Sequence, residues 1–141
     1  MDDDGEGLLA AAREAMQHAY AHYSGFRVGA ALLDGSGRIH SGCNVENASY
    51  GLTVCAERSA VCAMVCAGGR RIRAVAVACE GEQLPWPCGA CLQVIQEFVP
   101  EGANPPVIAC DRNGRAESTS LDALSPRRYR FSLMAPPEEE E

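Results

Sequence analysis

The cysteines of this chain carry its clearest chemical pattern. Two short segments stand out, Cys55-Ala56-Glu57-Arg58 and Pro87-Cys88-Gly89-Ala90-Cys91. A Cys-x-x-Cys pair at the start of a helix brings both sulfurs near the first turn, and the thiolate of Cys55 would complete a set of three zinc ligands. Three protein ligands leave the fourth tetrahedral position of zinc open for water, which is typical of a catalytic rather than a structural site.

Glu57 follows Cys55 by two residues, so it can stand beside such a metal without binding it. A carboxylate in that place can take a proton from the metal-bound water and pass it to a substrate. Zinc with three thiolates has a formal negative charge, which opposes loss of that proton, so positive compensation is expected. The helix N-termini at the cysteines would provide part of it. Arg58, one turn after Cys55, can donate to a zinc thiolate.

Other interpretations of the cysteines stay open. Taken alone, Cys88 and Cys91 are also typical of a thiol redox protein, and the three cysteines together are compatible with a non-enzymatic zinc-binding module. The two segments in combination, each at an expected helix start, favour a catalytic zinc site. The remaining five cysteines are Cys43, Cys62, Cys66, Cys79 and Cys110. They are expected to act as small packing residues, with Cys62 and Cys66 in the core.

Hydrophobic periodicity and turn residues indicate the elements that must position these groups. Helices are expected at residues 8–22, 55–67 and 89–98, with a short helical turn at 121–124. Strands are expected at residues 28–33, 38–43, 72–79, 107–110 and 115–120. A hairpin turn is expected at 34–37 and a binding loop at 44–53. This order of elements predicts the α/β class, as a single three-layer α/β/α domain with a mixed five-stranded sheet.

Length and charge limit the class of protein further. The 141 residues suit one domain at 8–134, between acidic tails at 1–7 and 135–141 that are expected to be disordered. Eight of the 19 acidic residues lie in these tails, so the body has 11 acidic and 12 basic residues. It lacks the strongly basic surface of a nucleic-acid binder. With no membrane-length apolar run and no signal peptide, a cytoplasmic protein without a nucleic-acid or membrane partner is expected.

Four segments in combination resemble the small cytidine deaminases of the homotetrameric, zinc-dependent type. They span about residues 20 to 99 and read YSGFRVGAA (23–31), GCNVENASYG (42–51), CAER (55–58) and PCGAC (87–91). The resemblance implies Zn²⁺ as cofactor, held by Cys55, Cys88 and Cys91, with Glu57 as the proton shuttle. The implied reaction is hydrolytic deamination of cytidine or 2′-deoxycytidine to uridine or 2′-deoxyuridine and ammonia, in pyrimidine salvage.

The resemblance also implies how a nucleoside substrate would bind. It assigns the ribose 3′-hydroxyl to Asn44 and Glu46 and the pyrimidine to Phe26, and it places Ala56 among the substrate-binding residues. The residue types agree, because alternation in an extended segment points Asn44 and Glu46 to the same side. An amide and a carboxylate can together donate to and accept from one hydroxyl. A carboxylate there would repel a 3′-phosphate, which favours a free nucleoside over a polynucleotide.

A neighbouring subunit is part of the implied site. In the family, the positions of Ala48 and Tyr50 reach the active site of the next subunit, which implies a homotetramer with shared sites. Tyr129 is the nearest equivalent of an aromatic residue that the family carries near its C-terminus. A deaminase of a cytosine-containing nucleoside antibiotic shares the zinc and glutamate chemistry and stays as an alternative, although Asn44 and Glu46 argue for an ordinary ribose.

Leu92 departs from the family pattern, which usually has arginine directly after the second cysteine of Cys-x-x-Cys. If that arginine helps to neutralise the zinc site, its absence leaves more of this role to Arg58. We expect Leu92→Arg to change the rate of deamination more than the zinc content, measured as kcat and as bound metal on the same preparation. Unchanged kinetics would remove position 92 from the account of the site.

Overall fold

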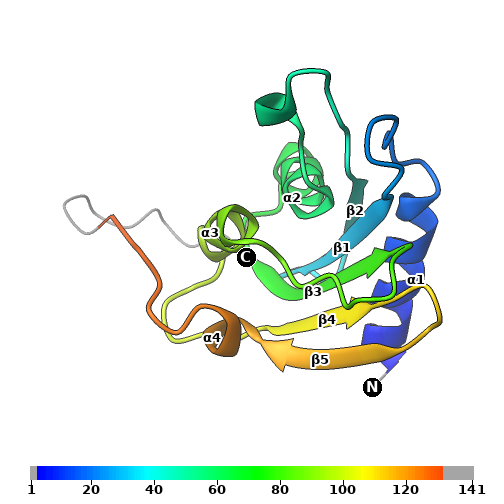
Figure 1. The fold of residues 1–141 in the computed structure, drawn as a ribbon. Coiled ribbons are helices and arrows are strands. Elements are labelled where there is room, and N and C mark those ends of the chain that lie inside the picture. Colours follow the sequence, from blue (N-terminus) through cyan, green and yellow to red (C-terminus); the bar gives the residue numbers. More distant parts are fainter. Residues whose placement is uncertain (1–2, 132–141) are drawn as a thin grey trace.

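Five strands form one mixed sheet in the computed structural model, which describes residues 3–131 (Figure 1). The strands are β1 (Val28–Asp34), β2 (Ile39–Cys43), β3 (Ile72–Cys79), β4 (Pro106–Cys110) and β5 (Ala116–Ser120). They lie in the order β2-β1-β3-β4-β5. Strands β3 and β4 run parallel, and the other neighbouring pairs are antiparallel.

Helices cover both faces of this sheet (Figure 1). Helix α1 (Asp3–Met16) lies on one face, and α2 (Ala56–Cys66) and α3 (Gly89–Gln96) lie on the other. A short 3-10 helix, η1 (Tyr50–Leu52), precedes α2, and α4 (Leu121–Leu124) follows β5. The predicted three-layer α/β/α arrangement with a mixed five-stranded sheet is confirmed. Among residues 3–131, no helix is long and apolar enough to cross a membrane.

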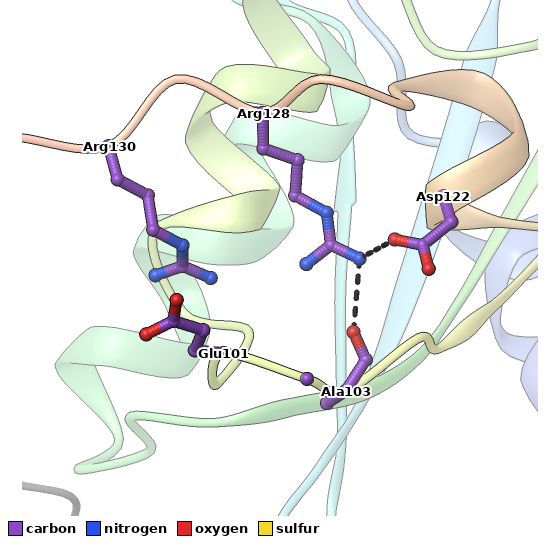
Figure 2. Close-up of a pocket in the computed structure, with 6 residues that line it drawn as sticks. Glu101, Ala103, Asp122, Arg128 and Arg130 are labelled. Carbon is purple, nitrogen blue, oxygen red and sulfur yellow. Dashed lines mark hydrogen bonds and ion pairs between the residues drawn. The ribbon is translucent and has the colours of Figure 1, made fainter.

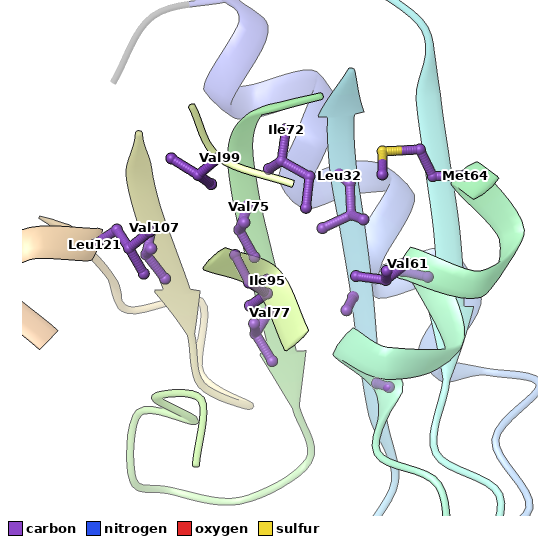
Figure 3. Packing of buried hydrophobic residues seen from close by; sticks show 13 residues of the cluster. Leu32, Val61, Met64, Ile72, Val75, Val77, Ile95, Val99, Val107 and Leu121 are labelled. Atoms are coloured by element: carbon purple, nitrogen blue, oxygen red, sulfur yellow. The ribbon is translucent and has the colours of Figure 1, made fainter. Parts of the chain in front are cut away.

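The two faces of β3 carry side chains of different size. Val75 and Val77 pack under α2 and α3 in the larger core (Figure 3). Ala74, Ala76 and Ala78 face α1. Other buried members of the larger core include Leu32, Val61, Met64, Ile95 and Leu121. The alternation predicted for this strand therefore separates a bulky core on the side of the cysteine segments from a thin layer under α1.

Two glycines let helices approach the sheet from opposite faces. A Cβ atom on Gly29 would overlap the backbone carbonyl of Ala12 in α1, and a Cβ atom on Gly42 would overlap the backbone nitrogen of Ala60 in α2. Any side chain at these positions would push a helix outward. The close approach at Gly42 matters for function because Cys55 stands at the start of α2.

Most predicted boundaries agree with the structure to within two residues. Helix α2 ends just before the Gly68-Gly69 pair, where Gly68 has a φ of 94° and the Gly69 N–H donates to the carbonyl of Met64 at 2.9 Å. This is the Schellman arrangement that closes many helices. The prediction that Cys62 and Cys66 are core residues was wrong. Both are exposed, because α2 turns Ala56, Ala60, Val61 and Met64 toward the sheet instead.

Helix α1 differs most from its predicted range of 8–22. It ends at Met16, although apolar residues continue at helical spacing. The chain beyond it pairs with an extended segment: Tyr20 N–H donates to the carbonyl of Asn44 at 3.0 Å, and Glu46 N–H donates to the carbonyl of Tyr20 at 2.8 Å. These long-range backbone bonds replace the continued helix, as tertiary contacts often override local propensity.

Residues 3–7 also differ from the prediction of a disordered tail at 1–7. From Asp3 onward this segment is helical, as the first turns of α1. Acidic side chains such as Asp4 and Glu6 interact favourably with the positive end of the helix dipole, which explains why an acidic segment continues the helix. The tail predicted at 135–141 and the domain end predicted at 134 lie outside the described residues.

A buried carboxylate closes the turn between β1 and β2. Asp34 Oδ1 accepts from the Ser36 N–H at 2.9 Å, the Ser36 hydroxyl at 2.7 Å and the Arg38 N–H at 3.0 Å. Its Oδ2 lies 2.7 Å from His40 Nε2. Burial opposes ionisation of Asp34, but the hydrogen bonds from His40, Ser36 and Arg38 outweigh it and hold the pKa of this carboxyl well below its usual range.

Asp34→Asn is expected to lower the free energy of unfolding at neutral pH by about 1–3 kcal/mol, because an amide cannot accept all four donors. A lowered folded-state pKa stabilises the protein above the unfolded value, near pH 4, and this contribution is lost as the pH falls through the folded value. The free energy of unfolding of the variant should therefore fall less than that of the wild type as the pH is lowered below about 4. Denaturant unfolding at several pH values measures both effects. Exposed Glu14 offers the control Glu14→Gln, and wild-type stability of Asp34→Asn at pH 7 would contradict the prediction.

Candidate active site

The structure brings together the three cysteines that the sequence singled out. The Sγ atoms of Cys55, Cys88 and Cys91 all lie within 4.8 Å of one another, and those of Cys88 and Cys91 are 3.6 Å apart. Cys55 is the N-cap residue of α2, and Cys88 is the N-cap residue of α3. Cys91 lies in the first turn of α3 and is buried. Two helices from distant parts of the chain therefore begin at one point.

Helix starts suit this cluster electrostatically. The first backbone N–H groups of a helix have no partners within the helix, and they carry the positive end of its dipole. A cysteine placed there loses its proton more readily. In α3 the backbone N–H of Cys91 contributes most to lowering the pKa of the Cys88 thiol. The Cys88 thiol therefore ionises more readily than an ordinary cysteine.

The pKa of the buried Cys91 shifts in the opposite direction. Burial raises the pKa of Cys91, and the negative charges of Glu57 and Cys55 raise it further. Without a cation, the cluster retains a proton on Cys91. A divalent metal removes this conflict by binding the deprotonated sulfurs, so metal binding here must release protons.

Glu57 lies beside the sulfurs and is nearly shielded from solvent, with 6% of its surface exposed. Burial raises the pKa of this carboxyl, while its own backbone N–H, the charge of Arg58 and a hydrogen bond with Cys91 work against the increase. A carboxyl with a raised pKa beside a potential metal site is suited to accept and return protons near neutral pH. The neighbouring Ala56 packs into the larger core, which leaves little of its surface for a substrate.

Arg58 makes the contact expected from the sequence. Its Nη2 lies 3.3 Å from Cys55 Sγ, whereas its Nε is buried without a hydrogen-bond partner among the described residues. The guanidinium therefore places a positive charge against the sulfur cluster. Leu92, where the resemblance would have a second arginine, instead packs against the larger core.

A backbone bridge joins the cysteine cluster to the segment of Asn44 and Glu46. Val45 and Val54 exchange two backbone hydrogen bonds, each 2.9 Å long, and Val54 directly precedes Cys55. Val45 pairs on its other side with Tyr20. Held between two neighbours, residues 44–46 are extended, so Asn44 and Glu46 share one side as alternation predicts.

The side chains of Asn44 and Glu46 are already engaged with protein groups. Asn44 Oδ1 accepts from the Val28 N–H at 2.9 Å, and Asn44 Nδ2 donates to the carbonyl of Phe26 at 2.9 Å. Glu46 Oε1 accepts from the backbone N–H groups of Tyr23 and Ser24, both at 2.9 Å, and Glu46 Oε2 accepts from the Ser24 hydroxyl. Asn44 keeps capacity for two further hydrogen bonds, one as donor and one as acceptor, and the Glu46 carboxylate keeps capacity for about one more as acceptor.

Ser24 is a site residue that the sequence analysis did not assign. Its hydroxyl donates to Glu46 and accepts from the Phe26 N–H at 3.0 Å. The Ser24 hydroxyl contributes most to lowering the pKa of Glu46 below its usual range, and the backbone N–H groups of Ser24 and Tyr23 lower it further. Ser24, Phe26, Asn44 and Glu46 thus form one network. Among the described residues, no hydrogen bond joins this network to the three cysteines.

A cavity of about 330 Å³ opens beside this network. It is lined by Tyr23, Ser24, Glu46, Asn47, Tyr50 and Thr53. The rings of Tyr23 and Tyr50 meet edge to face, with centroids 6.5 Å apart. The sequence analysis also did not assign three of these lining residues, Tyr23, Asn47 and Thr53. They meet only when the loop after β2 folds back over residues 20–24.

Ala48, Tyr50 and Tyr129 all face solvent in the single chain. Tyr50 is 80% exposed and Tyr129 is 65% exposed. The backbone around Tyr129 is fixed, because its carbonyl accepts from Gln96 Nε2 at 2.6 Å. Figure 2 shows Arg128 beside it donating to the carbonyl of Ala103, at 3.0 Å, and pairing with Asp122. The segment carrying Tyr129 is therefore held along the end of α3, with the tyrosine ring directed outward.

Comparison with known proteins decides the family. Residues 2–103 match the family model described as the cytidine and deoxycytidylate deaminase zinc-binding region. The chain is 44% identical over 126 residues to a cytidine deaminase of Sporosarcina psychrophila, which covers 89% of this chain and 91% of the relative. The chain belongs to this deaminase family.

Two further relatives agree with that assignment. A cytidine deaminase of Mycobacterium tuberculosis is 48% identical over 96 residues, or 68% of this chain and 72% of the relative. The crystal structure of cytidine deaminase from Burkholderia pseudomallei has a TM-score of 0.82 at 41% identity, covering 92% of this chain and 100% of that one. The resemblance stated from the sequence is confirmed.

The three sulfurs fit the zinc ion that defines this deaminase family. Their mutual spacing allows one tetrahedral ion to contact all three, and thiolates are preferred zinc ligands. Three protein ligands leave one coordination position for water or substrate. The buried Glu57 stands on the same helix turn as Cys55, where it can reach that position.

Cys91→Ser is expected to abolish stable zinc binding, because a serine hydroxyl stays protonated and replaces a thiolate poorly. Wild-type protein should carry about one zinc per chain, measured by elemental analysis of reduced samples. Cys62→Ser is a matched control, since Cys62 is exposed on α2 away from the cluster. Full zinc in Cys91→Ser, or loss of zinc in Cys62→Ser, would contradict this ligand assignment.

Proposed function

We propose that this member of the deaminase family hydrolyses free cytidine or 2′-deoxycytidine to uridine or 2′-deoxyuridine and ammonia. The observation that carries the proposal is Glu57, buried beside the three converging sulfurs in a chain 44% identical to a cytidine deaminase. The network around Phe26, Asn44 and Glu46 supports a nucleoside as substrate, because it brings an aromatic ring and hydroxyl-binding groups together in space.

Glu57 performs the proton transfers in this proposal. Cys55, Cys88 and Cys91 would hold the zinc ion, which would supply a Lewis acid and an activated water molecule. The Glu57 carboxylate would carry one proton of the attacking water to N3 of cytosine and the other to the amine on C4, which leaves as ammonia while the water oxygen stays on C4. Arg58 stabilises the deprotonated state of Cys55 by its contact with Sγ.

The substrate-binding roles follow the network. Phe26 packs against the pyrimidine, and Asn44 and Glu46 bind the ribose 3′-hydroxyl with the hydrogen-bonding capacity left to them. The ionised Glu46, whose pKa is lowered by Ser24, disfavours a phosphate at that oxygen. This supports a free nucleoside rather than a polynucleotide. The near-neutral body offers no strongly basic surface for a nucleic acid.

We further propose a homotetramer in which Ala48 and Tyr50 complete the site of a neighbouring subunit, with Tyr129 as a further contact. The exposed rings of Tyr23 and Tyr50, which meet edge to face, support this, since large apolar side chains gathered on a surface are typical of interfaces. Pyrimidine salvage in the cytoplasm is the proposed setting. The eight free cysteines suit a reducing compartment.

The deciding experiment measures ammonia release from cytidine and 2′-deoxycytidine, with zinc assayed on the same preparation. Turnover that requires about one zinc per chain and stops with a chelator supports the proposal and ranks the two substrates. Zinc without turnover would redirect the search to other cytosine nucleosides, such as antibiotics, or to a binding role. Absence of zinc in a reduced sample would favour thiol redox chemistry at Cys88 and Cys91.

Glu57→Gln is expected to keep its zinc and to lose on the order of 10²–10⁴-fold in kcat, the usual effect of removing a general acid–base group. Glutamine preserves size and hydrogen bonding but cannot carry the proton. Exposed Glu82 supplies the matched control, since Glu82→Gln lies outside the buried site and should retain wild-type kcat. Near-normal activity of Glu57→Gln would exclude it as the proton carrier.

A further inference from the structure

The backbone of Phe26 is fixed on both sides. Its N–H donates to the Ser24 hydroxyl at 3.0 Å, and its carbonyl accepts from Asn44 Nδ2 at 2.9 Å. The side chain itself is 44% exposed. The position of the ring therefore depends on what it rests against, because surface exposure alone would leave it free to adopt other rotamers.

Gly81 is the residue on which the ring rests. A Cβ atom at this position would lie 2.6 Å from Phe26 Cε1 and 3.3 Å from Phe26 Cζ, with Cys79 Sγ next at 3.7 Å. The backbone of Gly81 is not in the left-handed region, so its conformation does not require glycine. The missing side chain instead leaves the space that the edge of the Phe26 ring occupies.

The backbone around Gly81 has little freedom to move away from the ring. Glu80 N–H donates to the carbonyl of Arg27 at 3.2 Å, and the Gly81 carbonyl accepts from the Arg112 N–H at 2.9 Å. The side chains of Arg27 and Glu80 also form an ion pair. These contacts tie Glu80 to Arg27, the residue after Phe26, and tie Gly81 to Arg112, so an added methyl group would displace the Phe26 ring rather than the backbone.

We propose that Gly81 is a positioning residue for nucleoside binding, which holds the Phe26 ring where the pyrimidine packs against it. This inference rests on the proposed function. It assigns to Gly81 no contact with the zinc ligands or with Glu57. The binding of the base should therefore depend on residue 81, whereas the proton transfers should not.

Gly81→Ala tests this inference through a split between KM and kcat. We expect KM for cytidine, and the inhibition constant of the product uridine, to rise on the order of tenfold, in the range of a weakened contact between a base and an aromatic ring. We expect kcat, zinc content and melting temperature to stay near wild type. Gly7→Ala is the control, since Gly7 lies on α1 and an added Cβ meets nothing within 4 Å.

The double variant Phe26→Ala/Gly81→Ala shows whether the effect passes through the ring. Phe26→Ala alone should raise KM, and Gly81→Ala should add less than about twofold in that background, because coupled residues are not additive. An equal factor in both backgrounds, or unchanged KM and inhibition constant for Gly81→Ala, would overturn the inference. Should Gly81→Ala fold poorly, the inference requires the double variant to recover wild-type melting temperature.

Failure of the proposed function is distinguishable from failure of this inference. If wild-type protein with zinc releases no ammonia from cytidine or 2′-deoxycytidine, the proposed function fails before any variant is measured. If wild-type protein turns over and Gly81→Ala has the same KM, only the role of Gly81 fails.

Discussion

Three sulfur atoms within 4.8 Å of one another are the constraint on which the structure depends. They come from the starts of two helices, so α2 and α3 must begin at the same point before any metal can bind. Burial raises the pKa of Cys91, whereas the open helix start lowers the pKa of Cys88. These opposing effects mean that the fold assembles the site partly protonated. Zinc binding at these sulfurs would release protons, which makes it dependent on pH and couples it to the stability of the folded state.

The packing of the sheet explains how α2 is held in place. Gly42 lets the backbone of α2 approach β2 more closely than a side chain would allow, and Val75 and Val77 support the same layer of helices from β3. Because the first turn of α2 carries Cys55, Glu57 and Arg58, one helix start fixes a metal ligand, the proposed proton carrier and a compensating cation relative to one another. Their geometry follows from helical spacing rather than from contacts made by separate loops.

The sequence predicted the features that depend on local spacing. The strands follow alternation and turn residues, and the cysteine cluster follows two helix starts with recognisable ligand spacing. The end of α1 was not predictable, because Tyr20 leaves the helical pattern to pair with residues 44–46, which are distant in sequence. For the same reason neither Ser24 nor Gly81 was assigned to the site. Ser24 matters through its hydrogen bond to Glu46 and Gly81 through its contact with Phe26, and both contacts exist only after the loops have met.

The two halves of the site are stabilised by different physical means. Helix packing holds the cysteines and Glu57, whereas backbone hydrogen bonds and short polar side chains hold Phe26, Asn44 and Glu46. They are linked through the backbone: Val54 exchanges two hydrogen bonds with Val45 and is followed at once by Cys55. A shift of the segment around Asn44 would therefore act on Cys55 through these two hydrogen bonds and one peptide bond. Substitutions that disturb only side chains in the substrate half should leave the metal half intact, whereas substitutions that break the bridge between Val45 and Val54 should disturb both.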